Sequence, residues 1–207
     1  MKLIEQTIGA YSDLLASDFP TPGGGSTAAL NGVLGCSFIT MIARITEKKA
    51  GIAGDTALLR RIAAQAESLR QELLALIDED TEAYNGIMAA LPQPTGDSLR
   101  GALKIAVETP LRILHAALTA LNLARSLSED YYAGTASDLA LAALNLEAAA
   151  QGAYLTVRIN LNHLSDISAA DSDYVQRHAS ESAGRLAEAE GLARSIYDGA
   201  KALLEGE

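Results

Sequence analysis

The sequence predicts an all-α protein, built as a multi-helix bundle, on three observations. Hydrophobic residues make up 49% of the 207 residues, whereas aromatic residues make up only 4% and tryptophan is absent. The core must therefore consist of Ala, Leu and Ile, which are compatible with helices. Apolar residues recur at intervals of three and four along the chain, with no alternating strand pattern and no internal repeat. A chain of this length is expected to form one domain, residues 1–207, with a full core.

The first two predicted helices are separated by a run of glycines. Residues 3–15 have the apolar spacing of an amphipathic helix, which ends before Phe19-Pro20. The turn Thr-Pro-Gly-Gly-Gly-Ser follows at residues 21–26, and Ser26 is a suitable N-cap for a second helix that reaches about residue 46. Because this helix is apolar nearly all round, we expect it at the centre of the packing.

Capping and helix-breaking residues delimit the next two helices. Asp55 is expected to cap a helix that runs to about residue 90, where the segment Leu-Pro-Gln-Pro-Thr-Gly at 91–96 stops it. A fourth helical pattern covers residues 97–127. Pro110 lies inside this pattern, so it must either kink the helix or restart it.

Two further helices are predicted in the C-terminal part. Ser137 or Asp138 would cap a fifth helix that continues through Ile159. The last helix begins near Asp171 and carries a stripe of small and apolar residues. Ser182 is the one polar member of that stripe, so its hydroxyl is expected to bond back to its own helix.

The run of glycines is the first candidate for a binding site. Consecutive glycines lose much conformational entropy on folding, so a folded chain keeps them where the backbone adopts a positive φ or closely approaches another group. Gly23, Gly24, Gly25 and Ser26 would lie at the positive end of the second helix, where free N–H groups favour an anion or a developing oxyanion. Two interpretations remain at this point: a ligand-binding turn, and a tight turn packed beneath another helix.

Asp80 is the second candidate, because it falls on the apolar side of the third helix. That side is spaced at intervals of three and four through Ile62, Ala66, Leu69, Leu73, Leu76, Asp80, Ala83 and Ile87. A buried carboxylate costs several kcal/mol unless it is paired, so it indicates either a structural partner or a chemical role. The alternative is that the helix rotates and Asp80 joins the solvated acidic run 78–82.

Composition disfavours several classes of partner and site. The net charge of −10 disfavours nucleic acids and anionic membranes, which require clustered cations. The uncharged stretch 28–43 is shorter than the ~20 residues of a membrane span, so a buried helix is expected. Cys36 is the single cysteine and the N-terminus lacks a signal-like apolar segment, which favours a cytoplasmic protein. The three histidines lack metal-ligand spacing, so no metal site is expected.

A few basic and amide side chains stand out against this acidic background. Lys48 and Lys49 are the densest positive charge near the glycine turn, although such lysines are ordinarily a solvated helix end. Arg158 and Asn160 lie in an otherwise apolar run, where an arginine needs an anionic partner or a route to water.

These segments, taken together and in this order, resemble the formiminotransferase-cyclodeaminase C-terminal domain family, which includes free-standing methenyltetrahydrofolate cyclohydrolases. The matching segments are the turn at 21–26, Asp80-Thr81-Glu82-Ala83-Tyr84-Asn85, Thr109-Pro110-Leu111, Ser137-Asp138 and Val157-Arg158-Ile159-Asn160. Thr156 stands where the family usually has asparagine.

The resemblance implies an antiparallel helical bundle that forms a homodimer and binds a folate between its helices, with Asp80 as the catalytic group. The expected reaction is hydrolysis of 5,10-methenyltetrahydrofolate to 10-formyltetrahydrofolate, with Asp80 as general acid and base. The folate is the substrate, and no separate cofactor is expected. The alternatives are formiminotetrahydrofolate cyclodeaminase activity, or a non-catalytic helical dimer that binds folate or another partner.

The same resemblance assigns expected contacts to the folate. The glycine turn, Asp138 and Asn160 are expected to contact the substrate. Lys48, Lys49 and Arg158 are the candidates for its glutamate tail, since they offset an otherwise repulsive acidic surface.

Overall fold

The computed structural model describes residues 2–49, 55–92 and 97–206, and within them every regular element is helical. The α-helices are α1 (Ile8–Leu15), α2 (Gly24–Lys48), α3 (Thr56–Ala90), α4 (Asp97–Ser128), α5 (Ala136–Ile167) and α6 (Ser172–Glu205). Short 3-10 turns cover Leu3–Glu5, Ala133–Thr135 and Ala169–Asp171. The predicted fold class is therefore confirmed.

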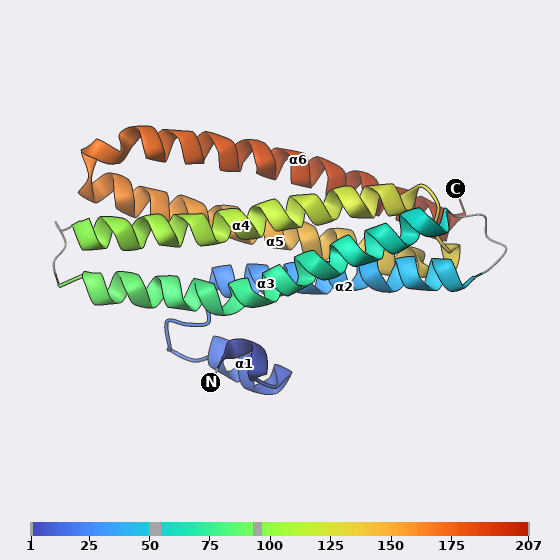
Figure 1. Cartoon of the computed structure of the whole chain (residues 1–207), viewed down its shortest axis with the longest axis horizontal. Helices are drawn as coiled ribbons and strands as arrows, with labels where there is room; N and C mark the ends of the chain where they lie inside the picture. The colour runs from blue at the N-terminus through green and yellow to red at the C-terminus, as the bar shows by residue number, and fades with distance from the viewer. Residues whose placement is uncertain (1, 50–54, 93–96, 207) are drawn as a thin grey trace.

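Five long helices lie side by side and alternate in direction, while α1 lies outside them near the start of α2 (Figure 1). α2 packs against α3 on one side and α5 on the other, and α4 packs against α3, α5 and α6. Buried Leu, Ile and Ala side chains from α2 to α6 form one main core, as the composition predicts.

The central position of α2 depends on its small residues. A methyl group added at Gly32 would come within 2.9 Å of the Leu73 side chain on α3, and one at Gly35 within 2.5 Å of Leu146 on α5. Among the described residues α2 is the one helix long and apolar enough to cross a membrane by length and composition, and 56% of its most apolar window is buried inside the bundle.

Three details differ from the sequence prediction. The opening segment is a 3-10 turn followed by the separate helix α1, rather than one helix. Gly23 occupies the N-cap position of α2, so Ser26 lies inside the first turn instead of capping it. α5 begins at Ala136 after a 3-10 turn, which places Ser137 and Asp138 in its first turn and not at its cap.

Pro110 lies within α4, which continues past it as one helix, so of the two alternatives, a kink or a restart, the restart does not occur. Proline has no N–H, which leaves the carbonyl four residues earlier without its helical partner. That carbonyl belongs to Ala106, and the Asn160 side chain of α5 donates a hydrogen bond to it at 2.7 Å. Asn160 thus supplies from a neighbouring helix the donor that Pro110 lacks.

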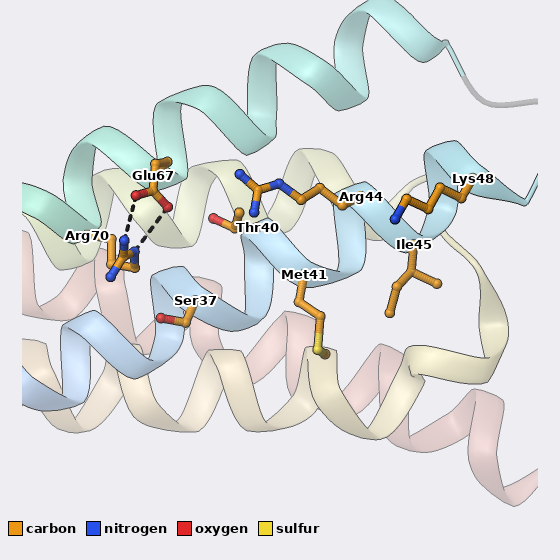
Figure 2. Close-up of a pocket in the computed structure, with 8 residues that line it drawn as sticks. All are labelled: Ser37, Thr40, Met41, Arg44, Ile45, Lys48, Glu67 and Arg70. Atoms are coloured by element: carbon orange, nitrogen blue, oxygen red, sulfur yellow. Dashed lines mark hydrogen bonds and ion pairs between the residues drawn. The ribbon is translucent and has the colours of Figure 1, made fainter.

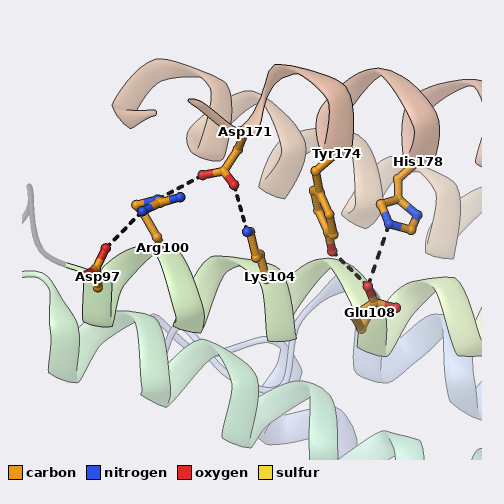
Figure 3. Close-up of polar contacts among 7 residues, drawn as sticks. All are labelled: Asp97, Arg100, Lys104, Glu108, Asp171, Tyr174 and His178. Carbon is orange, nitrogen blue, oxygen red and sulfur yellow. Dashed lines mark hydrogen bonds and ion pairs between the residues drawn. The ribbon is translucent and has the colours of Figure 1, made fainter. Parts of the chain in front are cut away.

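The start of α6 is held against α4 by a row of polar contacts (Figure 3). Asp171 is buried and accepts from Arg100 at 2.9 Å and from Lys104 at 2.7 Å. The Tyr174 hydroxyl donates to Glu108 at 2.9 Å. Further along α6, Ser182 is buried and its hydroxyl donates to the carbonyl of Ala179 at 3.2 Å, in its own helix as the sequence predicts.

Candidate active site

Asp80 on α3 faces the first turn of α2, and its partner there is Ser26. The Ser26 backbone amide donates to Asp80 Oδ2 at 2.8 Å, and the Ser26 hydroxyl donates to the same oxygen at 2.9 Å. No described residue donates a hydrogen bond to the second oxygen, Oδ1. The carboxylate is therefore oriented through one oxygen while the other remains available.

The first turn of a helix explains why Ser26 can hold the carboxylate. The first N–H groups of a helix have no carbonyl partner inside it, and the helix dipole favours a negative charge at this end. α2 begins at Gly24, so the Ser26 amide is one of these free donors. Asp80 accepts a hydrogen bond from this amide although it belongs to another helix. Of the two alternatives left open by the sequence, the carboxylate therefore faces α2 and does not join the solvated acidic run 78–82.

Of the glycines in the turn, Gly25 is the one that permits this close approach, and none of the three has an unusual backbone conformation. No described glycine except Gly206 has a positive φ, so the positive-φ interpretation does not hold for Gly23, Gly24 or Gly25. A methyl group at Gly25 would overlap the Asp80 carboxylate, coming within 2.5 Å of its carbon. At Gly24 the nearest group would be the Thr156 hydroxyl on α5, 3.9 Å away.

Burial controls the protonation of this carboxylate. Desolvation raises the pKa of Asp80, and the two hydrogen bonds from Ser26 oppose that rise. A carboxylate whose pKa is raised binds a proton more strongly than an exposed aspartate does. Asp80 is thus suited both to accept a proton and to return it.

Tyr11 and the hydroxyls around Ser26 were not predicted as site residues. The Tyr11 hydroxyl of α1 lies 3.4 Å from the Thr27 hydroxyl, and Thr81 Oγ1 lies 3.4 Å from the Ser26 hydroxyl. Burial and then the Asp80 charge raise the pKa of Tyr11, opposed by its hydrogen bond with Thr27. In the sequence Tyr11 fits the apolar spacing of the opening helix, and nothing in that pattern indicates that its hydroxyl lies near the site.

Lys48, Lys49 and Asp138 lie at the other end of the bundle. Lys48 follows Ser26 by 22 residues along one helix, which corresponds to about 33 Å. The Lys49 ammonium lies 4.9 Å from the centre of the Tyr132 ring, and Asp138 is in the first turn of α5, the end of α5 next to this end of α2. Within one chain the structure does not bring these residues to Asp80.

Arg158 and Asn160 lie toward the Asp80 end of α5. Arg158 is half-buried and forms no ion pair with any described residue. Asn160 donates to Ala106 on α4, so its amide has a structural partner in the folded chain.

In the part of the chain that the structure describes, no group of three or more His, Cys, Asp or Glu side chains converges as metal ligands would. The groups that do converge are the Asp80 carboxylate, two hydroxyls and free helix N–H groups. Such a set can bind a cation, accept a proton from water and stabilise a developing oxyanion.

Comparison with known proteins shows that this chain is similar to folate enzymes. A family model described as formiminotransferase-cyclodeaminase matches residues 7–179. The methenyltetrahydrofolate cyclohydrolase of Methylorubrum extorquens is 31% identical over 205 residues, covering 95% of this chain and 96% of that protein. The formimidoyltransferase-cyclodeaminase of Gallus gallus is 31% identical over 79% of this chain, which spans only 32% of that longer protein. The crystal structure of formiminotetrahydrofolate cyclodeaminase from Thermotoga maritima superposes with a TM-score of 0.83 at 27% identity, covering 99% of this chain and 98% of that one.

Proposed function

Because this chain belongs to the formiminotransferase-cyclodeaminase family, we propose that it hydrolyses 5,10-methenyltetrahydrofolate to 10-formyltetrahydrofolate, with Asp80 as the catalytic group. The observation that carries the proposal is the half-buried Asp80 carboxylate, held through one oxygen by Ser26 at 2.8 and 2.9 Å. The cyclohydrolase relative supports this choice of substrate, since it matches nearly the full length of both chains.

The reaction adds water to the carbon that bridges folate nitrogens 5 and 10. The substrate carries a delocalised amidinium cation, which a negative carboxylate stabilises electrostatically. Asp80 accepts a proton as the water oxygen bonds to that carbon. It then returns the proton to nitrogen 5 as the carbon–nitrogen bond breaks, and the hydroxyl of the adduct releases its proton to solvent as the formyl carbonyl forms. Acid–base help of this kind contributes about 100- to 10,000-fold.

The geometry suits this sequence of proton transfers. Asp80 Oδ2 is held by Ser26, so Oδ1 is the oxygen that would meet the water. The remaining amides of the turn at 23–26 would meet a developing oxyanion or a folate carbonyl. No resident cofactor enters any step.

The direct test follows the decay of the methenyl chromophore with and without the protein. We expect decay to accelerate in proportion to enzyme concentration, and an unchanged rate at saturating substrate would contradict the proposal. The matched control is Glu82→Gln, which removes an exposed acid two residues from Asp80 and should retain full activity.

A second activity has a specific observation behind it. The Thermotoga maritima structure that superposes on this chain is a formiminotetrahydrofolate cyclodeaminase. That reaction expels ammonia from a formimino group, and we expect it to be slower here. If ammonia release from 5-formiminotetrahydrofolate is more efficient than methenyl hydrolysis, the order of the two activities is reversed.

We also propose that two copies associate in the cytoplasm through α2 and α5. Leu141, Leu144, Leu155 and Ile159 form a partly exposed apolar stripe on α5, and on the adjacent α2 Leu34 is exposed at 45%. Apolar surface of this kind is typical of association sites. Sedimentation should give a dimer, and Leu155→Lys should shift it toward the monomer.

A further inference from the structure

A hollow further along α2 than the Asp80 site has an unusual charge for this protein. A groove of about 410 Å³ lies between α2 and α3, and three of its lining side chains are the cations Arg44, Lys48 and Arg70 (Figure 2). Glu67 is the only acid among its lining residues. The chain as a whole carries a net charge of −10, so this concentration of positive charge is local.

Glu67, the one acid among the lining residues, already accepts hydrogen bonds from neighbouring side chains. Arg70 donates to both Glu67 oxygens, at 3.0 and 2.6 Å, and Gln71 donates to one of them at 2.9 Å. These bonds, chiefly that from Arg70, lower the pKa of Glu67 to about 2. They also fix the Arg70 guanidinium, whose remaining N–H groups are free to donate to a ligand.

The two cations on α2 are less tightly engaged than Arg70, although the charge of Arg44 helps to lower the pKa of Glu67. Neither Arg44 nor Lys48 forms an ion pair with any described residue, and both lie on the groove wall one helical turn apart. Side chains at this spacing leave about 5–6 Å between their Cβ atoms. Figure 2 shows the cations spread along the groove and not gathered around one point. A ligand that contacts them all must therefore carry more than one anionic group.

The other lining residues favour an anion with an apolar organic body. The hydroxyls of Ser37 and Thr40 donate to carbonyls of their own helix at 2.7 and 2.9 Å, so they do not offer hydrogens to a ligand. Met41 and Ile45 add apolar side chains to the lining, and they extend from α2 on the side away from Arg70 (Figure 2). The volume lies within the range of about 300–1,000 Å³ that small-molecule sites occupy.

We propose that this groove binds an organic polycarboxylate, with Arg44, Lys48 and Arg70 on its carboxylates and its apolar body on Met41 and Ile45. The groove lies further along α2 than the Asp80 site, since its lining on this helix begins at Ser37, about 16 Å past Ser26, and ends at Lys48, about 33 Å past it. The inference does not depend on the hydrolysis proposed above. Two sources share this chemistry, the aryl-glutamate portion of a folate and an aliphatic polycarboxylate.

The three methionines of the chain allow a direct test. With ¹³C-methyl methionine, the Met41 signal reports on the groove, while the exposed Met88 near the end of α3 serves as an internal control. Titration with p-aminobenzoyl-glutamate or citrate should shift Met41 and leave Met88 in place, with a Kd of about 1 mM or tighter. Tighter binding of the first probe would identify the folate portion as the source, and tighter binding of citrate the aliphatic one.

Matched variants separate recognition from general charge. Arg44→Gln/Lys48→Gln should weaken binding about tenfold or more, since hydrogen bonds between charged groups are stronger than those between neutral ones. Arg194→Gln/Lys201→Gln makes the same charge change on exposed positions of α6 and should leave binding unchanged. Equal weakening in both double variants would overturn the proposal. An unchanged Met41 signal with both probes at about 10 mM, ten times a Kd of about 1 mM, would overturn it as well.

Two further measurements complete the test. The diamide of p-aminobenzoyl-glutamate and inorganic phosphate should both bind at least about tenfold more weakly than the better carboxylate probe, and equal binding of either would contradict a polycarboxylate site. Asp80→Asn should bind the probes normally. Failure of the hydrolysis assay would thus leave this inference standing, and loss of probe binding would leave the hydrolysis standing.

Discussion

Gly25 has no side chain at the point where the Asp80 carboxylate lies, and a single methyl there would come within 2.5 Å of the carboxyl carbon. Glycine is required at this position because another residue's side chain occupies the space. The contact with the Asp80 carboxylate is thus sufficient to explain the glycine at position 25, with or without a ligand at the turn.

Gly25→Ala should displace Asp80 and lower kcat by about 100-fold, because misplacement of a catalytic group by about 1 Å has effects of that size. The matched variant is Gly24→Ala, where the nearest group to the new methyl is Thr156 at 3.9 Å. If Gly24 lies against the folate, its substitution should weaken folate affinity more than it lowers Tm. Measuring kcat, folate affinity and Tm on both variants tests the assignment, and normal activity in Gly25→Ala would contradict it.

Asp80→Asn should lower kcat by about 100-fold or more while the protein folds normally. Asparagine has the same size and still accepts the Ser26 amide, but it has no charge and accepts no proton from water. Steady-state assays beside Glu82→Gln give the comparison. Retained activity would make Asp80 structural, and unfolding would mean that its charge anchors the packing.

Stability should depend on pH at Asp80 in a defined direction. Because its pKa is raised in the folded protein, the carboxylate destabilises the fold at pH values above that pKa, and this penalty is relieved as Asp80 takes up a proton. Asp80→Asn should therefore raise Tm at neutral pH, with a gain that shrinks as the pH falls toward the acidic range. A gain that grows on acidification would contradict the raised pKa.

Ser26→Ala should move the acidic limb of the activity profile to higher pH. The lost hydroxyl bond at 2.9 Å stabilises the ionised form, so its removal raises the pKa of Asp80 further. The backbone amide remains, so activity should persist at alkaline pH. A profile identical to that of the unaltered protein would show that the hydroxyl bond does not tune the carboxylate.

Asn160→Ala should cost about 1–3 kcal/mol in the free energy of unfolding, because the Ala106 carbonyl loses the side-chain donor that takes the place of the missing Pro110 N–H. Asn145→Ala is the control, since Asn145 bonds a carbonyl of its own helix near the surface. In a double-mutant cycle Pro110→Ala restores the missing N–H, and the cost of Asn160→Ala should then fall. Strictly additive costs would contradict this pairing.

Much of the fold follows from local patterns, as α3 shows. Asp55 accepts hydrogen bonds from the amides of Ala57 and Leu58, so the predicted cap of α3 is confirmed, and α3 ends at Ala90 as the proline-rich stop indicates. These features depend on neighbours within one helical turn. The position of Asp80 on the apolar side likewise follows from spacing alone.

The hydrogen-bond partner of Asp80 could not be predicted from local spacing. Ser26 is 54 residues away in the sequence, and its amide became the donor only because α2 starts two residues before the predicted cap. The distance between Ser26 and Lys48 was available from the helix length, which corresponds to about 33 Å. Pro110 likewise indicated that one carbonyl of its helix lacks a partner. Only the packing of α5 against α4 shows that Asn160 donates a hydrogen bond to that carbonyl.

The anchoring of the N-terminal segment has a practical consequence for work on this protein. The Leu3 amide donates to Asp78 at 2.6 Å, two residues from Asp80, so a purification tag fused ahead of Leu3 would emerge beside the site. The described C-terminal end of α6 lies at the far end of the bundle (Figure 1). A tag fused there leaves the approach to Asp80 open, and kinetic constants measured with tags at opposite ends should differ for that reason alone.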